Sequence, residues 1–454
     1  MIARDLATWG LGVTTMPEPV REAAVRHLLD GIGNSIAGFR SGSADPAIHV
    51  ARGLGGPPES TILGTSARVS APAAALANGT LVHALDFDDT HAGGLVHATA
   101  VVLPAAFAVG EQVGASGEEI LLAAIVGYEA VCRIAAAAPH GFHSRGLHAT
   151  MVAGVFSSAL IASRLCGLDV EQTTNALGIA GSQAGGLLAF LATGASTKQL
   201  HPGFASQSGI IAARLASAGA TGPETVFDGP HGVFDALASG ATNPESIVDA
   251  LGERWETTRI GIKPYPACQL SHATLDALKA ARRQVNFAPE DVEFVTARVH
   301  PDSASVVCDT SRDLTRPASP YAAKFSLPWS AAAIIVDQDM TLATFEPASI
   351  SRPQVAEIAA RISIELAPSA NVAADARGEV LVGLRDGRRI VGSVERSAGG
   401  PDNPLSDAEL HAKFTGNVGD DSARIIAAIE ALEDQPTLHN IMTVVAKTTV
   451  EDSK

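Results

Sequence analysis

The stretch LDFDDTH, residues 85–91, is the one around which the rest of this chain is organised, and His97 follows six residues later. Positions 86–97 hold three carboxylates, a hydroxyl and two imidazoles, whereas the flanking residues 71–85 and 98–110 are small or apolar. Ionisable groups lose hydration free energy in apolar surroundings, so such a cluster indicates a functional site. A polar helix end followed by a solvated loop is the alternative interpretation.

The composition indicates a large core of small side chains. Of the 454 residues, 46% are hydrophobic, 18% are charged and only 4% are aromatic. This length allows two or three domains, and the small apolar residues favour closely packed helices. The four cysteines are far apart and form no CxxC pair, which fits reduced thiols in a cytosolic protein; they are Cys132, Cys166, Cys268 and Cys308.

Charge and hydropathy exclude several classes of partner. The formal net charge of −16 argues against binding to nucleic acid or to an anionic membrane surface. The first residues carry early charges and no apolar core, so they do not resemble a signal peptide. No run approaches the roughly twenty apolar residues of a spanning helix. We therefore expect a soluble, cytoplasmic protein, in which binding of an anionic substrate needs basic residues concentrated locally.

The first part of the chain has the apolar spacing of successive helices. Helices are expected at residues 19–40, 45–54, 71–85, 100–113, 117–138, 148–165, 170–184 and 205–218. Residues 139–145 are expected to form a polar loop, and residues 185–202 a loop rich in Gly, Ser and Thr. No convincing strand pair is visible in this part.

The pattern changes after residue 263. Residues 291–300 alternate as a strand does, and 379–385 and 388–394 form two more strands around the hairpin signal Asp386-Gly387. Helices are expected at 271–285, 319–337 and 352–365, and again at 406–415 and 420–432. We predict a mainly α protein, with a large all-helical domain from residues 1–263 and 400–454 and an inserted smaller α+β domain from residues 264–399.

The acidic cluster contains one carboxylate of particular interest. If the cluster continues the preceding helix, Asp86, Asp89 and Thr90 share one face, because residues three and four apart are neighbours. Asp86 is nearest to the apolar run and is the best candidate for a buried base. Asp88 and Asp89 fit helix capping or a backbone-bonded turn.

The same cluster matches the Asp-x-Asp-x-Thr nucleophile motif of haloacid-dehalogenase phosphatases. That motif follows a buried β-strand of a doubly wound domain, and here it follows a segment of helical composition, residues 75–84. A motif counts only in its structural context, so we reject this interpretation.

Basic residues supply the other half of a possible site. His140 and His143 fit a solvated loop, and their spacing to His148 does not place three metal ligands on one helix face. His148 opens a long apolar helix, where it can meet a substrate or move a proton. Lys198 and Lys263 lie in Gly- and Pro-bounded segments, the setting of lysines that hold carboxylates.

Five ordered segments resemble the signatures of the MmgE/PrpD family, and the resemblance runs from about residue 5 to residue 430. The segments are NGTLVHALDFDDTH (78–91), GLHAT (146–150), STKQLHPG (196–203), KPYPAC (263–268) with Ser271-His272, and KFSLPW (324–329). The family includes 2-methylcitrate dehydratase, cis-aconitate decarboxylase and iminodisuccinate epimerase.

The resemblance implies a helical domain from both chain ends, an inserted α+β domain, a pocket between them, a homodimer, and chemistry without a metal or organic cofactor. The positions that it assigns to the pocket are Asp86, Thr90, His97, His148, Lys198, Lys263 and His272. Trp329 stands where the decarboxylase has a tyrosine and offers an indole N–H but no titratable hydroxyl. Asp88 stands where the dehydratase branch typically has Asn.

We therefore hypothesise a cofactor-independent lyase, a dehydratase or decarboxylase, that removes a proton next to a carboxylate of a small di- or tricarboxylate. Lys198 and Lys263 would hold carboxylates with Thr90, His272 and Trp329, and His148 would move protons with His97 or Asp86. An epimerase or isomerase of an iminodisuccinate-like dicarboxylate is the alternative, followed by a non-catalytic carboxylate-binding protein.

Overall fold

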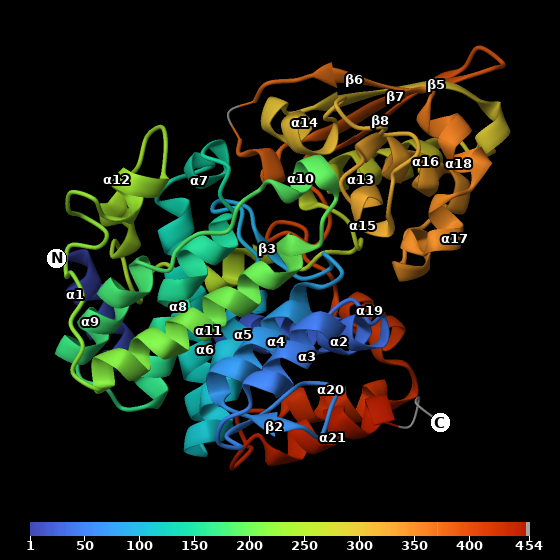
Figure 1. The fold of residues 1–454 in the computed structure, drawn as a ribbon. Coiled ribbons are helices and arrows are strands. Elements are labelled where there is room, and N and C mark those ends of the chain that lie inside the picture. Colours follow the sequence, from blue (N-terminus) through green and yellow to red (C-terminus); the bar gives the residue numbers. More distant parts are fainter. Residues whose placement is uncertain (370, 451–454) are drawn as a thin grey trace.

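The computed structural model describes residues 1–369 and 371–450; the end of the predicted helical domain, residues 451–454, lies outside them. The chain is mainly α, as the sequence predicts, with a helical part and a smaller part that contains the one larger sheet of the described residues (Figure 1). Among the described helices, none combines the length and the apolar character that crossing a bilayer requires.

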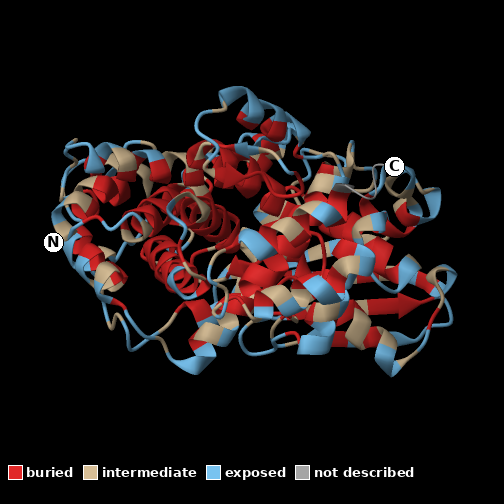
Figure 2. Cartoon of the chain, turned by 90° about the horizontal axis from the view of Figure 1, so that it is seen from below, coloured by how far each residue is buried: buried red, intermediate tan, exposed pale blue. Residues whose placement is uncertain are grey.

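The helical part begins with twelve helices. They are α1 (Ile2–Gly12), α2 (Glu18–Arg40), α3 (Asp45–Leu54), α4 (Ala71–His83), α5 (Thr99–Val113), α6 (Gly117–Ala136), α7 (Gly141–Ser144), α8 (Ala149–Leu165), α9 (Val170–Gly181), α10 (Phe190–Thr193), α11 (Thr197–Ser217) and α12 (Val233–Leu237). Three C-terminal helices, α19 (Asp407–Val418), α20 (Ser422–Glu430) and α21 (His439–Val450), return to pack on α2. In Figure 2 several of the helices are buried around their whole circumference.

Helix α4 lies at the centre of this part, and every one of its residues is buried. Its small side chains allow α11 to approach until the two backbones touch. A Cβ atom on Gly79 would lie 2.7 Å from the backbone nitrogen of Gly203, and one on Gly203 would lie 2.2 Å from the Leu76 carbonyl oxygen. The two glycines therefore hold the start of α11 beside the end of α4, where the acidic cluster begins.

The smaller part is an α+β unit. Its sheet has the order β6 (Ile362–Leu366), β5 (Val292–Val299), β7 (Gly378–Leu384), β8 (Arg389–Val394), with β6 parallel to β5 and the other pairs antiparallel. Helix α13 (Gln269–Gln284) packs on β7 and β8. The remaining helices are α14 (Pro301–Val307), α15 (Pro320–Ala323), α16 (Leu327–Asp337), α17 (Pro347–Ile350) and α18 (Pro353–Ala359).

Two separate hydrophobic cores correspond to these two parts. The first draws on residues between Ile2 and Ile262 and again from Leu405 to Val445. The second draws on residues from Tyr265 to Ile390, together with Phe190 from the helical part. We propose that the domain boundaries lie where the sequence places them, at 263/264 and 399/400.

Several local predictions are wrong. Residues 352–365 do not form one helix, because α18 ends at Ala359 and the alternating residues 362–366 pair with β5 as an edge strand. The predicted helix 319–337 breaks at residues 324–326, where Ser326 caps α16 by accepting the Trp329 N–H. Residues 139–145, predicted as a loop, include the short helix α7.

Candidate active site

The acidic cluster is a turn between α4 and α5 and does not continue the helix. Asp86, three residues beyond the last residue of α4, has φ +54°, in the left-handed region that non-glycine residues rarely adopt. Asp86, Asp89 and Thr90 therefore do not share a helix face, contrary to the prediction. Backbone strain of this kind is kept where the surroundings enforce it, often at functional sites.

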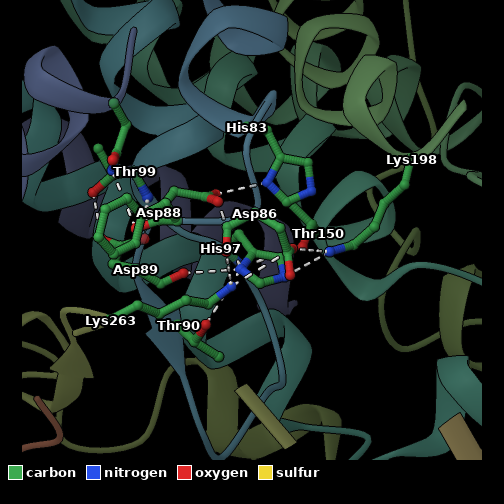
Figure 3. A network of polar contacts seen from close by, with 12 residues as sticks. His83, Asp86, Asp88, Asp89, Thr90, His97, Thr99, Thr150, Lys198 and Lys263 are labelled. Atoms are coloured by element: carbon green, nitrogen blue, oxygen red, sulfur yellow. Dashed lines mark hydrogen bonds and ion pairs between the residues drawn. The ribbon is translucent and has the colours of Figure 1, made fainter. Parts of the chain in front are cut away.

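Two lysines surround the Asp86 carboxylate, which is completely buried (Figure 3). Lys198 donates a hydrogen bond to Oδ1. Lys263 Nζ lies 3.5 Å from the same oxygen and 2.9 Å from the Asp86 carbonyl oxygen, to which it donates. Burial alone would raise the pKa of Asp86, but the two ammonium groups outweigh it and hold the pKa well below its ordinary value.

A two-residue ladder brings Lys263 to this place, although it is distant in sequence. Strand β3 (Thr90–His91) pairs antiparallel with β4 (Ile260–Gly261), with Thr90 opposite Gly261. The ladder fixes the segment before Lys263 directly beside the acidic turn. Lys198 comes from the first turn of α11, so its predicted position in a loop is wrong; Pro202 lies inside that helix and does not end a loop.

His97 is held with one ring nitrogen facing the lysine. Its Nδ1 lies 2.9 Å from the Asp89 carbonyl oxygen and therefore donates, which leaves the Nε2 lone pair 3.5 Å from Lys198 Nζ. Burial, with the nearby Lys198 and Lys263, lowers the pKa of His97 well below its ordinary value. His97 is thus a neutral imidazole at neutral pH.

Asp88 and Asp89 make structural contacts on the side of the turn away from Lys198. Asp89 accepts the N–H of Thr99 at 3.0 Å, at the start of α5, as well as the Thr99 hydroxyl. Burial raises the pKa of Asp89 to about 7. Asp88 Oδ2 lies 2.7 Å from His83 Nδ1, and both side chains are fully buried.

His148 lies at the N-cap of α8 and presents a free nitrogen. Its Nδ1 is 3.1 Å from His201 Nδ1, and its buried Nε2 has no hydrogen-bond partner within the described residues. The ring centroid of His148 lies 5.7 Å from those of both His83 and His97. Burial, assisted by Lys198, lowers the pKa of His148 well below its ordinary value, so this imidazole can accept a proton.

These groups line a hollow between the two parts of the chain. Its lining residues are Asp86, Thr90, Leu95, His97, His143, His148, Leu188, Phe190, Leu191, Lys198, Cys268, Gln269, Leu270, Val306 and Phe325. Five of the eight residues predicted from the sequence are thus brought to one cavity wall: Asp86, Thr90, His97, His148 and Lys198.

The other three predicted residues do not line the hollow. Lys263 lies behind Asp86 and reaches the cavity only through it. His272 is fully buried on α13, where its Nε2 lies 3.1 Å from the Ala267 carbonyl oxygen and so braces the segment after Lys263. Trp329 packs against Phe345 in the α+β core, which does not support the predicted contact with substrate.

Sequence reasoning missed several residues that the structure brings to the site. His143, predicted for a solvated loop, lines the hollow, and Cys268 and Gln269 line it from the α+β side. His83 and His201 lie behind the cavity imidazoles. His83 could have been found from the sequence, because it is an isolated histidine in the uncharged run before the acidic turn. The other missed residues reach the site only through the tertiary fold, so no local pattern predicts them.

Two triads of described residues place potential metal ligands within 4.8 Å of one another: His83, His97 and His148, and His83, Asp86 and Asp88. Neutral imidazoles are good ligands for zinc. The Lys198 ammonium, however, lies 3.5 Å from the Nε2 atom that His97 would contribute. A fixed positive charge at that distance opposes a divalent cation, so the donor set suits proton transfer better than metal binding.

Two family models match the chain. Residues 4–246 match the MmgE/PrpD N-terminal domain and residues 265–434 the MmgE/PrpD C-terminal domain. The chain is also 28% identical over 450 residues to a cis-aconitate decarboxylase of Aspergillus terreus, with 93% of this chain and 90% of the relative covered. Cis-aconitate decarboxylases of Mus musculus and Homo sapiens are each 29% identical, over 94% and 96% of this chain and 89% and 93% of the relatives.

Proposed function

The chain belongs to the MmgE/PrpD family, and from this premise we propose that it is a lyase, a decarboxylase or dehydratase, that acts on a small di- or tricarboxylate. The reaction removes or returns a proton at the carbon next to a carboxylate and uses no metal or organic cofactor. The curated relatives that bear the name cis-aconitate decarboxylase support the decarboxylase branch.

The observation that carries the proposal is the position of Lys198. Its ammonium bonds to Asp86, lies 3.5 Å from His97 Nε2 and lines a cavity that is also lined by His148, whose Nε2 has no partner within the described residues. A cation with an unprotonated imidazole nearby is what enolate formation requires, because negative charge develops on a carboxylate while a proton moves at the adjacent carbon.

Each residue then has a defined task. Lys198, with the Thr90 hydroxyl, holds the substrate carboxylate on which charge develops. His148 carries the proton, since its Nε2 is unpartnered and its pKa is lowered. Asp86 and Lys263 form a fixed pair behind Lys198 that keeps its ammonium group in place.

A single NMR experiment tests this proposal. Small di- and tricarboxylic acids, cis-aconitate first, are incubated with the protein in deuterated water, and the products are identified. Loss of a carboxylate or a new alkene supports a lyase, and His148→Ala and Lys198→Ala should each abolish turnover. Unimpaired turnover in either variant would contradict the role of the residue that was replaced. If the protein converts none of the acids, the proposal is contradicted.

An epimerase or isomerase of an iminodisuccinate-like dicarboxylate is the second candidate. It is favoured by the two neutral imidazoles that line the cavity, His97 and His148, whose ring centroids lie 5.7 Å apart. Two bases can serve opposite faces of one carbon. The same experiment separates the candidates, because an epimerase introduces solvent deuterium into an acid that is otherwise unchanged.

Homodimer formation is a further part of the proposal. Light scattering of the purified protein should give twice the chain mass of 46.4 kDa. A mass equal to that of one chain would contradict it.

A further inference from the structure

The cavity has very little charge for a site that would receive a polyanion. Among the described residues that line it, only Asp86 and Lys198 have charged side chains. With Lys263 behind them, the three groups leave one net positive charge, and the imidazoles of His97, His143 and His148 have lowered pKa values and add none at neutral pH. That one net charge neutralises one carboxylate, and the neutral hydrogen-bonding groups of Thr90 and Gln269 remain on the lining for a second.

Most of the remaining lining is apolar, with Thr90, Cys268 and Gln269 as the exceptions. Seven aliphatic and aromatic side chains contribute to it: Leu95, Leu188, Phe190, Leu191, Leu270, Val306 and Phe325. Leu95 comes from the loop between β3 and α5, and the other six come from the segment around α10 and from the α+β part. The rings of Phe190 and Phe325 pack edge to face with centroids 6.0 Å apart and make this wall continuous across the two parts.

The boundary between the polar and the apolar wall lies at Lys198. Its Nζ is 5.1 Å from the centroid of the Phe325 ring and also bonds to Asp86. A substrate whose carboxylate meets Lys198 therefore extends its remaining substituent along Phe325 and the leucines. A carboxylate on the part of the substituent that lies along these apolar side chains would be buried without a partner, which costs far more than a buried alkyl group gains.

Because the polar and the apolar lining residues are separated in this way, we propose that the substrate of this chain has at most two carboxylates and an alkyl substituent that packs on the apolar wall. The inference rests on the proposed function, whose carboxylate-holding Lys198 it uses, and it narrows the substrate class from di- and tricarboxylates to alkyl-substituted dicarboxylates. The reactive carbon lies at the Lys198 end, beside His97 and His148.

Two saturated acids of nearly equal shape test the proposal by calorimetric titration of the purified protein. Propane-1,2,3-tricarboxylate bears a carboxymethyl group where 2-isobutylsuccinate bears an isobutyl group, so the pair differs mainly in one charge. We expect the isobutyl compound to bind at least roughly tenfold more tightly. In the series 2-methyl-, 2-ethyl- and 2-propylsuccinate, Kd should fall about fourfold with each methylene.

A charge placed on the apolar wall should reverse this preference. Leu188→Arg introduces a cation among the apolar lining residues and should bring the affinity for the tricarboxylate to that for the isobutyl compound or above it. Leu187→Arg is the matched control, because Leu187 is the neighbouring residue, is 65% exposed and does not line the cavity. It should leave the order of the two acids unchanged.

Different results would contradict the inference about the substrate and the proposed function. If the tricarboxylate binds the wild-type protein as tightly as the isobutyl compound, the inference is overturned and the proposed function stands. If none of these acids binds, or if Lys198→Ala binds them as the wild type does, both are overturned. A shift of preference in Leu187→Arg equal to that in Leu188→Arg would also overturn the inference, because the effect would then not arise in the cavity.

Discussion

His83 Nδ1 lies 2.7 Å from Asp88 Oδ2, and both side chains are completely buried. Because an ionised carboxylate only accepts hydrogen bonds, the imidazole donates from Nδ1 and keeps a lone pair on Nε2. That nitrogen has no partner within the described residues, and the ring centroid of His83 lies 4.7 Å from that of His97. Asp88 thus fixes the tautomer of an imidazole that packs beside His97 and His148, two of the histidines that line the cavity.

Removing this acceptor should reduce turnover without removing substrate binding. In Asp88→Leu, His83 loses its fixed tautomer, and kcat should fall about 10–100-fold with KM nearly unchanged, as when other orienting partners are lost. Asp88→Asn should recover most of the activity, because its amide oxygen can accept the same N–H. Steady-state kinetics across pH, with melting temperature as the folding control, would measure this; equal impairment in both variants would contradict a positioning role.

Much of the fold was predictable from local patterns. The helix predicted at 45–54 coincides with α3, and the hairpin at Asp386-Gly387 joins β7 to β8. Strand β6 was not predictable, because its five residues follow an amphipathic helix pattern and its parallel partner β5 is more than sixty residues earlier. A short edge strand takes its structure from that distant partner rather than from its own sequence.

The site was predictable as a set of residues but not as a geometry. The ordered motifs identified Asp86, His148 and Lys198, which do meet at one cavity. The left-handed conformation of Asp86 has no local signal, and it decides which carboxylate faces the lysines. Trp329 lies within a matching motif but its indole packs into a core, which no linear pattern reveals.

The charges behind the cavity should be coupled energetically. Lys263→Met removes one of two cations from the buried Asp86 carboxylate, and we expect the free energy of unfolding to fall by about 3–5 kcal/mol. Asp86→Asn in the same chain should recover part of that loss, because the buried carboxylate that Lys263 stabilises is then absent, although Lys198 also loses its ionic partner. Urea unfolding of the two single variants and the double variant measures the coupling.

A lysine nearer the surface provides the comparison for this double-mutant cycle. Lys279 pairs with Asp339, which is largely exposed, at 2.8 Å, so Lys279→Met should cost less than about 1 kcal/mol. Additive losses in Lys263→Met and Asp86→Asn would mean that the two groups do not interact as the 3.5 Å distance indicates.

Asp89 should make stability depend on pH in a specific interval. Burial raises its pKa from 3.8 to about 7, so the folded protein holds this proton more tightly than the unfolded chain. The resulting stabilisation is complete below the unfolded pKa and is lost as the pH rises from about 4 to 7. Asp89→Asn carries no titrating proton, and its amide oxygen can still accept the Thr99 N–H. The wild type should therefore lose stability relative to the variant across this interval, and parallel curves of melting temperature against pH would contradict the assignment.

Metal removal should leave activity unchanged, and added zinc should reduce it. One ring nitrogen from each of His83, His97 and His148 lies within 4.8 Å of the others, but the Lys198 ammonium, 3.5 Å from His97 Nε2, places a positive charge beside the position that a metal cation would take. Dialysis against a chelator should not alter kcat, because the proposed chemistry uses only the lysines and neutral imidazoles. Zn²⁺ in excess should inhibit by binding the imidazoles that must exchange protons, and His83→Ala should weaken that inhibition by removing one ligand. Loss of activity on chelation, with recovery on adding zinc, would instead assign the triad to a metal and replace the proton-transfer role of His148 with that of a ligand.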